Sequence, residues 1–204
     1  MLEASAREIH RQLIGPHDVD VYSYTWRMAE WEGLTGLYDY QDQQAWDPAD
    51  YARFPRNHHN IFPHWYGVQR ACRCFHQYTT RLNLRYDLVV RTRHDIWPYH
   101  PVQYHQLDPN LFNVSARHWP DHPSFVFDDN LTVTSHDNYI SFYHDLFDWY
   151  LLRPMHHFFD ISEVKLAESA VDRGFAHRVR RVRMLNFELT RGVLSGERPR
   201  EDDS

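Results

Sequence analysis

The chain has 204 residues, a length that fits one domain and leaves room for a sizeable core. Apolar residues make up 42% of the chain and only seven residues are glycine, which indicates a globular protein rather than a disordered or fibrous one. The formal net charge of -6 argues against a sequence-independent nucleic-acid binder, because such proteins present a basic face to phosphate groups.

The cysteines and the apolar runs indicate the compartment. Cys72 and Cys74 are the two cysteines of the chain, and they lie two apart in a segment with helical spacing, where their side chains point in different directions. Two buried free thiols are therefore expected, as in a reducing compartment. The chain opens without the pattern of a signal peptide, and no apolar run approaches the roughly 18 residues of a transmembrane helix. A cytoplasmic protein without a transmembrane segment is expected.

The first half of the chain predicts helices and strands in alternation. Apolar residues recur at helical spacing over residues 2–13, and residues 18–26 have the composition of a strand. Residues 41–60 are polar and interrupted by proline, which predicts a long surface loop. A helical period over residues 60–82 then leads into an apolar strand at 88–90. A helix between two strands is typical of a right-handed β-α-β unit, so an α/β fold with a mostly parallel sheet is expected.

The second half predicts shorter elements. Residues 98–123 are irregular around one short strand, LFNVSA, at 111–116. The stretch SFVFDDN at 124–130 predicts an apolar strand that ends on two carboxylates, and residues 135–151 predict a well-packed helix. The basic run RVRRVR at 178–183 alternates arginine with valine, which favours the solvated side of an edge strand over a nucleic-acid site.

The last elements complete one domain. Asp160 and Glu163 have the spacing of a capping box for a helix that ends at Gly174. Leu185, Phe187 and Leu189 alternate as in a strand. We expect one domain over residues 1–191 and a disordered C-terminal tail over residues 192–204.

Charged residues follow two of the expected strands. Arg91, Arg93 and Asp95 follow one strand, and Asp128 and Asp129 follow the next. In open parallel sheets, ligands bind beyond the carboxyl ends of the strands. Two guanidinium groups suit a diphosphate, and nearby carboxylates suit a hard cation such as Mg²⁺ or Mn²⁺ that bridges phosphate oxygens. The combination predicts a site for a nucleotide diphosphate.

Each of these residues also has a structural interpretation. Arg91 or Arg93 could pair with Asp128 or Asp129 and so hold two loops together, because ion pairs at the bases of loops are common. The two aspartates could bind a metal ion or act as a general base, and the FDDN stretch fits an Asx-type turn equally well. Glu163 could act only in the capping box.

Three blocks of the chain resemble a known group. They are NIFPHWYGVQRACRCFHQYTTRLNLRYDLVVRTRHDIW, FVFDDNLTVTSHDNYISFYHDLFDWY and ISEVKLAESAVDRGF. In their order and short motifs they resemble the small GT-A-like glycosyltransferases of polysaccharide and surface-glycan synthesis, which carry an R-x-R-x-D block, an acidic block and a P-E-x-x-L helix. The resemblance covers most of residues 18–190.

The resemblance implies a single GT-A-like, Rossmann-related sheet flanked by helices. It also implies transfer of a sugar from a nucleotide-diphosphate donor to a hydroxyl group of a glycan acceptor. Asp95 takes the position of the last acid of the metal-binding D-x-D motif, and Asp128 and Asp129 take that of the later acidic block. Glu163 takes the position of the Glu in the P-E-x-x-L helix.

The chain departs from the group at three points. Arg93 stands in place of the first Asp of the D-x-D motif, and Ser162 stands in place of the Pro of the P-E-x-x-L helix. The group also begins with a strand and a short loop that holds the nucleotide. Relative to the group, the chain is therefore expected to be N-terminally truncated.

For a glycosyltransferase, we expect Arg91, Arg93 and Asp95 to bind and neutralise the leaving diphosphate, with Mg²⁺ or Mn²⁺ at Asp95. A carboxylate would take the proton of the acceptor hydroxyl. Asp128 and Asp129 are the first candidates for this base, and Glu163 is the next.

Two other functions stay open. One is a non-catalytic remnant or binding module of the same fold that acts in a glycan-assembly complex. The other is a metal hydrolase that uses some of the sixteen histidines.

Overall fold

The computed structural model combines helices and strands, so the chain has the α/β fold class that the sequence predicted. Its contacts divide the chain into two compact units. The sheet unit lies within Met1–Val19, Leu88–Ser135 and Glu163–Ser204, and the helical unit within Asp20–Asp87 and His136–Ser162. The residues that the structure describes are 2–26, 40–44, 61–93, 95–116, 127–153 and 162–189.

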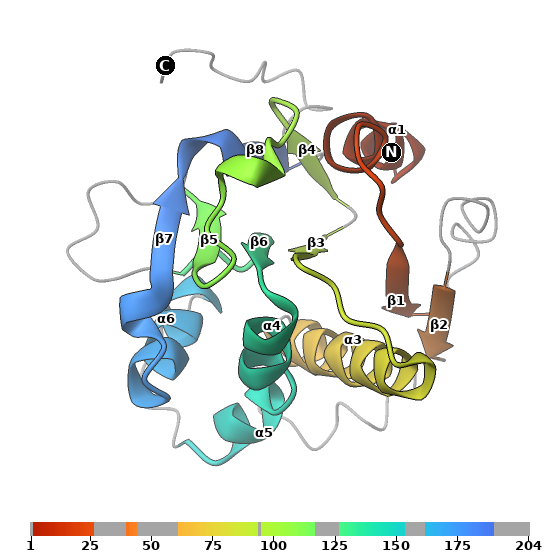
Figure 1. Cartoon of the computed structure of the whole chain (residues 1–204). Coiled ribbons are helices and arrows are strands. Elements are labelled where there is room, and N and C mark those ends of the chain that lie inside the picture. The colour runs from red at the N-terminus through yellow and green to blue at the C-terminus, as the bar shows by residue number, and fades with distance from the viewer. Residues whose placement is uncertain are drawn as a thin grey trace. The chain divides into compact units, whose positions relative to one another are not determined.

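A four-stranded sheet forms the centre of the sheet unit. Figure 1 shows its strands from left to right in the order β7 (Val179–Val182), β5 (Phe112–Ser115), β6 (Leu131–Thr134) and β3 (Val89–Thr92). The pairings of β6 with β3 and with β5 are antiparallel, and that of β5 with β7 is parallel. The sheet is therefore mixed, and the prediction of a mostly parallel sheet is wrong.

The helix before β3 explains this difference. The prediction assumed that the strands on either side of that helix belong to one sheet, as in a β-α-β unit. In the structure the earlier strand, β1 (Tyr22–Trp26), pairs with β2 (Tyr40–Gln44) in a separate two-stranded parallel sheet. The helix therefore does not join neighbouring strands of the four-stranded sheet. Periodicity in the sequence predicted both strands but not their partners.

The sheet unit also contains a second, two-stranded sheet and several helical segments. β4 (Ile96–Pro98) pairs antiparallel with β8 (Phe187–Leu189), and the Ser5 hydroxyl of α1 (Leu2–Ile9) donates to the Ile96 carbonyl over 2.7 Å. The last helix, α6 (Ser162–Asp172), lies in this unit from Glu163 onward. Short helical turns complete the unit: His10–Ile14, which is π-helical, and the 3-10 turns Tyr104–Gln106, Ala176–Arg178 and Arg183–Leu185.

Apolar side chains from these elements pack into one core. Ile96, Leu131, Leu185 and Phe187 are each 0% exposed within it. α1 contributes Ile9 and the π-helical turn that follows it contributes Leu13, so the helical segment predicted at the start of the chain packs as its apolar spacing indicated. The core holds the ends of β4, β6 and β8 together.

In the helical unit, α3 (Ile61–Leu82) packs against α4 (His136–Tyr143) and α5 (Leu146–Leu151). The single helix expected at 135–151 is thus divided in two. The side-chain carbonyl of Gln69 accepts hydrogen bonds from the backbone N–H groups of Phe147 and Asp148 over 2.7 and 3.2 Å. This buried side chain satisfies the first backbone donors of α5, which stabilises a new helix start there.

Several local predictions can be compared with the structure. Residues 41–44 belong to β2, so that part of the expected surface loop is a strand, whereas residues 45–60 lie outside the described residues. Asp160 and the expected C-terminal tail also lie outside them. Gly174 follows α6 with a φ of 76°, which confirms the predicted helix stop.

Both cysteines are free thiols, but only Cys72 is fully buried. None of the described helices meets the length and apolarity needed to cross a membrane.

Candidate functional site

The predicted site residues converge because β3 and β6 are antiparallel. Thr92 at the end of β3 pairs with Leu131 at the start of β6. Phe127–Asn130 is not a strand, so the two aspartates directly precede β6, whereas residues 124–126 of the predicted strand lie outside the described residues. Asp128 and Asp129 nevertheless lie beside the arginines that end β3, since an antiparallel strand starts where its partner ends. We call residues 128–130 the acidic turn.

Both arginines reach the acidic turn. Arg91 is 8% exposed, and its Nη1 donates to the backbone carbonyl of Asp129. Arg93 binds both carboxylate oxygens of Asp95, through Nε at 2.8 Å and Nη2 at 2.7 Å, and its Nη1 donates to Oδ1 of Asn130 at 3.2 Å. Arg93 therefore forms its ion pair with Asp95. The alternative considered from the sequence was an ion pair of Arg91 or Arg93 with an aspartate of the turn.

Asp128 shapes the acidic turn. Its Oδ1 accepts the backbone N–H groups of Asn130 at 2.8 Å and Leu131 at 3.3 Å, so the Asx-type turn is confirmed. Its Oδ2 is buried and has no hydrogen-bond partner within the described part of the chain. Burial raises the pKa of Asp128 to about 6, and the charge of Asp129 adds to this rise while the two backbone donors oppose it.

Glu163 meets the acidic turn from the first turn of α6. Its backbone carbonyl accepts the N–H of Phe127 over 3.3 Å, which fixes the start of α6 beside the turn. Burial is the largest cause that raises the pKa of Glu163, to about 7, and the charges of Asp129 and Asp128 contribute. The backbone N–H of Glu163 itself and the Arg93 guanidinium oppose the rise. Three carboxyl groups and one guanidinium thus interact at this site.

The buried carboxyl of Asp128 should make stability depend on pH. Folding raises its pKa from 3.8 to about 6, so its stabilising effect is complete below pH 4 and is lost as the pH rises through 6. A shift of this size corresponds to about 3 kcal/mol. Asp128→Asn keeps an acceptor at Oδ1 but cannot ionise. The difference in free energy of unfolding between wild type and variant should therefore fall by about this amount between pH 4 and pH 8.

Urea unfolding at several pH values between 4 and 8 measures this difference. Glu163 titrates in the same range and its pKa is raised in part by the charge of Asp128, so the difference reports Asp128 together with its effect on Glu163. Two curves that stay parallel over the whole range would show that the Asp128 carboxyl is not perturbed by burial.

The donor atoms do not fit a dedicated metal site. Both oxygens of Asp95, the expected metal ligand, are bound by Arg93. Among the residues that the structure describes, no group of three or more His, Cys, Asp or Glu side chains could hold a metal ion. No step proposed below depends on a metal ion, and Mg²⁺ or Mn²⁺ at Asp95 stays a prediction.

The structure brings together all six residues predicted for the site and adds Asn130. Asn130 accepts from Arg93 through its side chain and donates to Asp128 through its backbone N–H. The sequence showed Asn130 only as part of the FDDN turn signal, which does not reveal an arginine partner from another strand. No model of a known protein family matches the chain, and no curated protein matches it either. The link to the glycosyltransferases therefore rests on the motifs quoted above.

Proposed function

We propose that the chain is a glycosyltransferase that moves a sugar from a nucleotide-diphosphate donor to a hydroxyl group of a glycan acceptor. The observation that carries this proposal is the position of Glu163, whose carboxyl has a pKa raised to about 7 and lies within electrostatic reach of Arg93. A general base works best when its pKa lies near the working pH. Proton acceptance and phosphate binding are thus supported at one site.

Arg93 is suited to contact the diphosphate. Its guanidinium has five N–H donors, of which the bonds to Asp95 and Asn130 use three. The other two donors have no partner among the described residues and can serve phosphate oxygens, and about 35% of the side chain is exposed. Asp95 holds the plane of the guanidinium, so its orientation is set before a ligand binds. As the donor bond breaks, negative charge grows on the diphosphate, and a fixed cation there lowers the barrier.

Arg91 has a supporting role in this proposal. Its guanidinium is almost fully buried and holds the backbone of the acidic turn through the Asp129 carbonyl. Asp128 and Asp129 then act mainly through charge, because they raise the pKa of Glu163. Glu163 becomes the preferred base, whereas the sequence had placed the two aspartates first. Glu163 is half-buried, which leaves it accessible to an acceptor, while both aspartates are buried.

Arg93→Ala should abolish donor binding. Removal of the guanidinium takes away these two donors and one of the two arginine charges at the site. The measurement is a thermal-shift screen of UDP, GDP, TDP and CMP and their sugars, each with Mn²⁺ and with EDTA. A ligand at 100 times its Kd stabilises the native state by about 2.7 kcal/mol. The wild type should show a shift with one nucleotide class, and the variant should show none relative to its own melting point.

Arg11→Ala provides a matched control. Arg11 is also an arginine of the sheet unit that is ion-paired with a carboxylate, Glu8, but it lies on the turn after α1. This variant should keep the nucleotide shift. A full shift in Arg93→Ala would place the donor elsewhere, and no shift with any nucleotide in the wild type would favour the non-catalytic binding module. Loss of the shift in EDTA alone would support the predicted metal ion.

A further inference from the structure

The outer edge of the four-stranded sheet carries a cluster of basic side chains. β7 is the last strand of the sheet and pairs only with β5 among the described strands. Figure 1 shows β7 at the end of the sheet, with β5 on its inner side. The prediction of an edge strand for RVRRVR is therefore confirmed within the described residues. One row of its backbone N–H and C=O groups faces away from β5.

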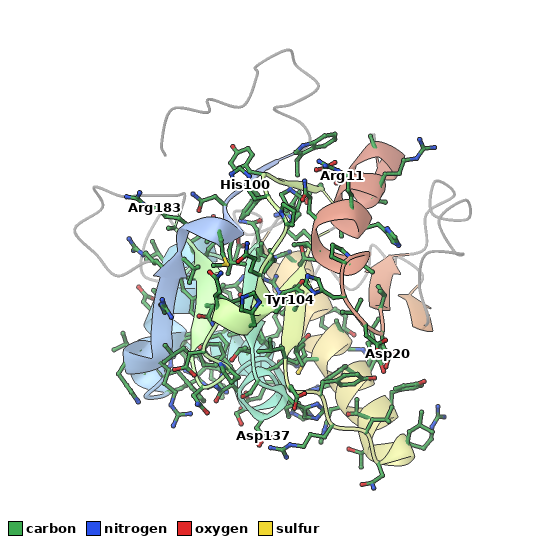
Figure 2. All side chains as sticks on the ribbon, turned by 45° about the horizontal axis from the view of Figure 1, so that its top comes forward. Arg11, Asp20, His100, Tyr104, Asp137 and Arg183 are labelled. Atoms are coloured by element: carbon green, nitrogen blue, oxygen red, sulfur yellow. The ribbon has the colours of Figure 1, made fainter. Side chains whose placement is uncertain are left out.

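The side chains along this edge are basic and exposed. They are His177, Arg178, Arg180, Arg181 and Arg183, which we call the basic edge. Arg180 and Arg183 make no ion pair with a described residue, and Figure 2 shows Arg183 extending outward from the ribbon. The Arg178 guanidinium lies 5.9 Å from the Phe175 ring centroid, which restricts the side chain next to β7.

Protection against aggregation is one explanation of this composition. Edge strands often carry charges that block pairing with a second edge, and lysine is the residue most used for this. The basic edge has four arginines and no lysine, in a chain whose net charge is -6. Arginine differs from lysine because its planar fork binds carboxylates with two parallel hydrogen bonds. Lys165 is the one lysine of the whole chain, so the absence of lysine is not specific to this edge. The four arginines nevertheless supply forked donors that suit carboxylate or phosphate groups.

The arrangement of the arginines favours a strand over a flat polyanion. Arg180 and Arg181 are adjacent in β7, so their side chains point to opposite faces of the sheet, and both are exposed. A membrane or a nucleic-acid duplex would contact one of these faces at a time. A strand added beside β7 also alternates its side chains between the two faces. Its acidic side chains would meet an arginine on each face.

We propose that the outer edge of β7 is a docking site for an extended acidic segment of a partner protein, which adds a strand to the sheet. Backbone hydrogen bonds to β7 supply affinity, and arginine–carboxylate pairs on both faces supply specificity. β7 is four residues long, so the contact is small and the complex should be transient. This proposal is independent of the sugar-transfer site, because it uses none of the residues around the acidic turn.

Binding of a defined peptide tests this proposal. The probe is a fluorescein-labelled peptide of sequence Val-Glu-Asp-Val-Glu-Asp-Val, in which neighbouring acids point to opposite faces of a strand. The measurement is fluorescence polarisation with the full chain. The peptide should bind in the micromolar range, and NMR amide shifts should be largest at Val179–Val182. Arg180→Ala with Arg181→Ala should weaken binding about tenfold, the effect expected for two exposed ion pairs.

The matched control removes the same charge elsewhere in the sheet unit. Arg7→Ala with Arg11→Ala lowers the net charge equally on the helical segment at the start of the chain, and it should change the affinity less than twofold. A peptide of equal charge with proline at the valine positions should bind at least tenfold more weakly, because it cannot pair with a strand. Equal binding of the proline peptide would overturn strand pairing. Tighter binding of a single-stranded DNA 12-mer or of phosphatidylserine vesicles would overturn the acidic peptide as the partner.

Discussion

Replacing Glu163 with glutamine should lower the rate of sugar transfer by about 10²–10⁴-fold, the contribution typical of a general base. Glutamine keeps the size of the side chain but cannot accept a proton at neutral pH. The wild-type rate should rise with pH through about 7, because the carboxyl must be ionised to act and burial has raised its pKa to that value. The residual rate of the variant should lack this rise. The assay is release of the nucleotide from the donor that the thermal-shift screen identifies.

Glu168→Gln is the matched control for this variant. Glu168 lies on the same helix, is about half exposed and forms an ion pair with Lys165 over 2.7 Å. Its replacement should leave the rate and the pH profile within twofold of wild type. Donor binding should survive in Glu163→Gln, since the arginines are unchanged. If both glutamine variants kept the full rate, the base would have to be another group, and Asp129 would be the next to replace.

The sequence predicted the members of the site better than their geometry. Arg93 and Asp95 follow an apolar strand as expected, whereas Arg91 lies within β3. Arg91 and Arg93 do reach the same turn. Their meeting with Asp128 and Asp129 was expected from two parallel strand ends. It arises instead from the antiparallel pairing of β3 and β6. Local composition indicates a strand, whereas its direction depends on long-range pairing that the local pattern does not encode.

The ranking of the carboxyl groups shows the same limit. Asp128 and Asp129 are adjacent in the sequence and were the first candidates for the base. Burial then separates their environments from that of Glu163, which lies 34 or more positions later and is half-buried. The pKa of a carboxyl depends on its solvation and on charges nearby in space. Neither quantity follows from spacing along the chain, so the proposal of Glu163 as the base required the fold.

Phe112→Ala should be the most destabilising single change considered for the sheet unit, with a loss of about 3–5 kcal/mol in the free energy of unfolding. Phe112 on β5 is 0% exposed, and its ring lies 5.8 Å from that of Phe127 and 5.6 Å from that of Phe175. The cavity left by the ring would remove support from Phe127. This residue precedes Asp128 and bonds to the Glu163 carbonyl, so the acidic turn should loosen as well.

Urea unfolding measures the loss of stability, and the exposed Val171→Ala on α6 is the control, with an expected change within about 0.5 kcal/mol. The effect on the acidic turn has a separate readout in the pH dependence of stability. If the turn loosens, water reaches Asp128, its pKa falls toward the ordinary value, and the destabilisation between pH 4 and pH 8 becomes smaller. A variant that is destabilised but keeps the full pH dependence would show that Phe112 supports the core without supporting the turn. In that case the hydrogen bonds of Arg91, Arg93 and Glu163 alone would hold the site in place.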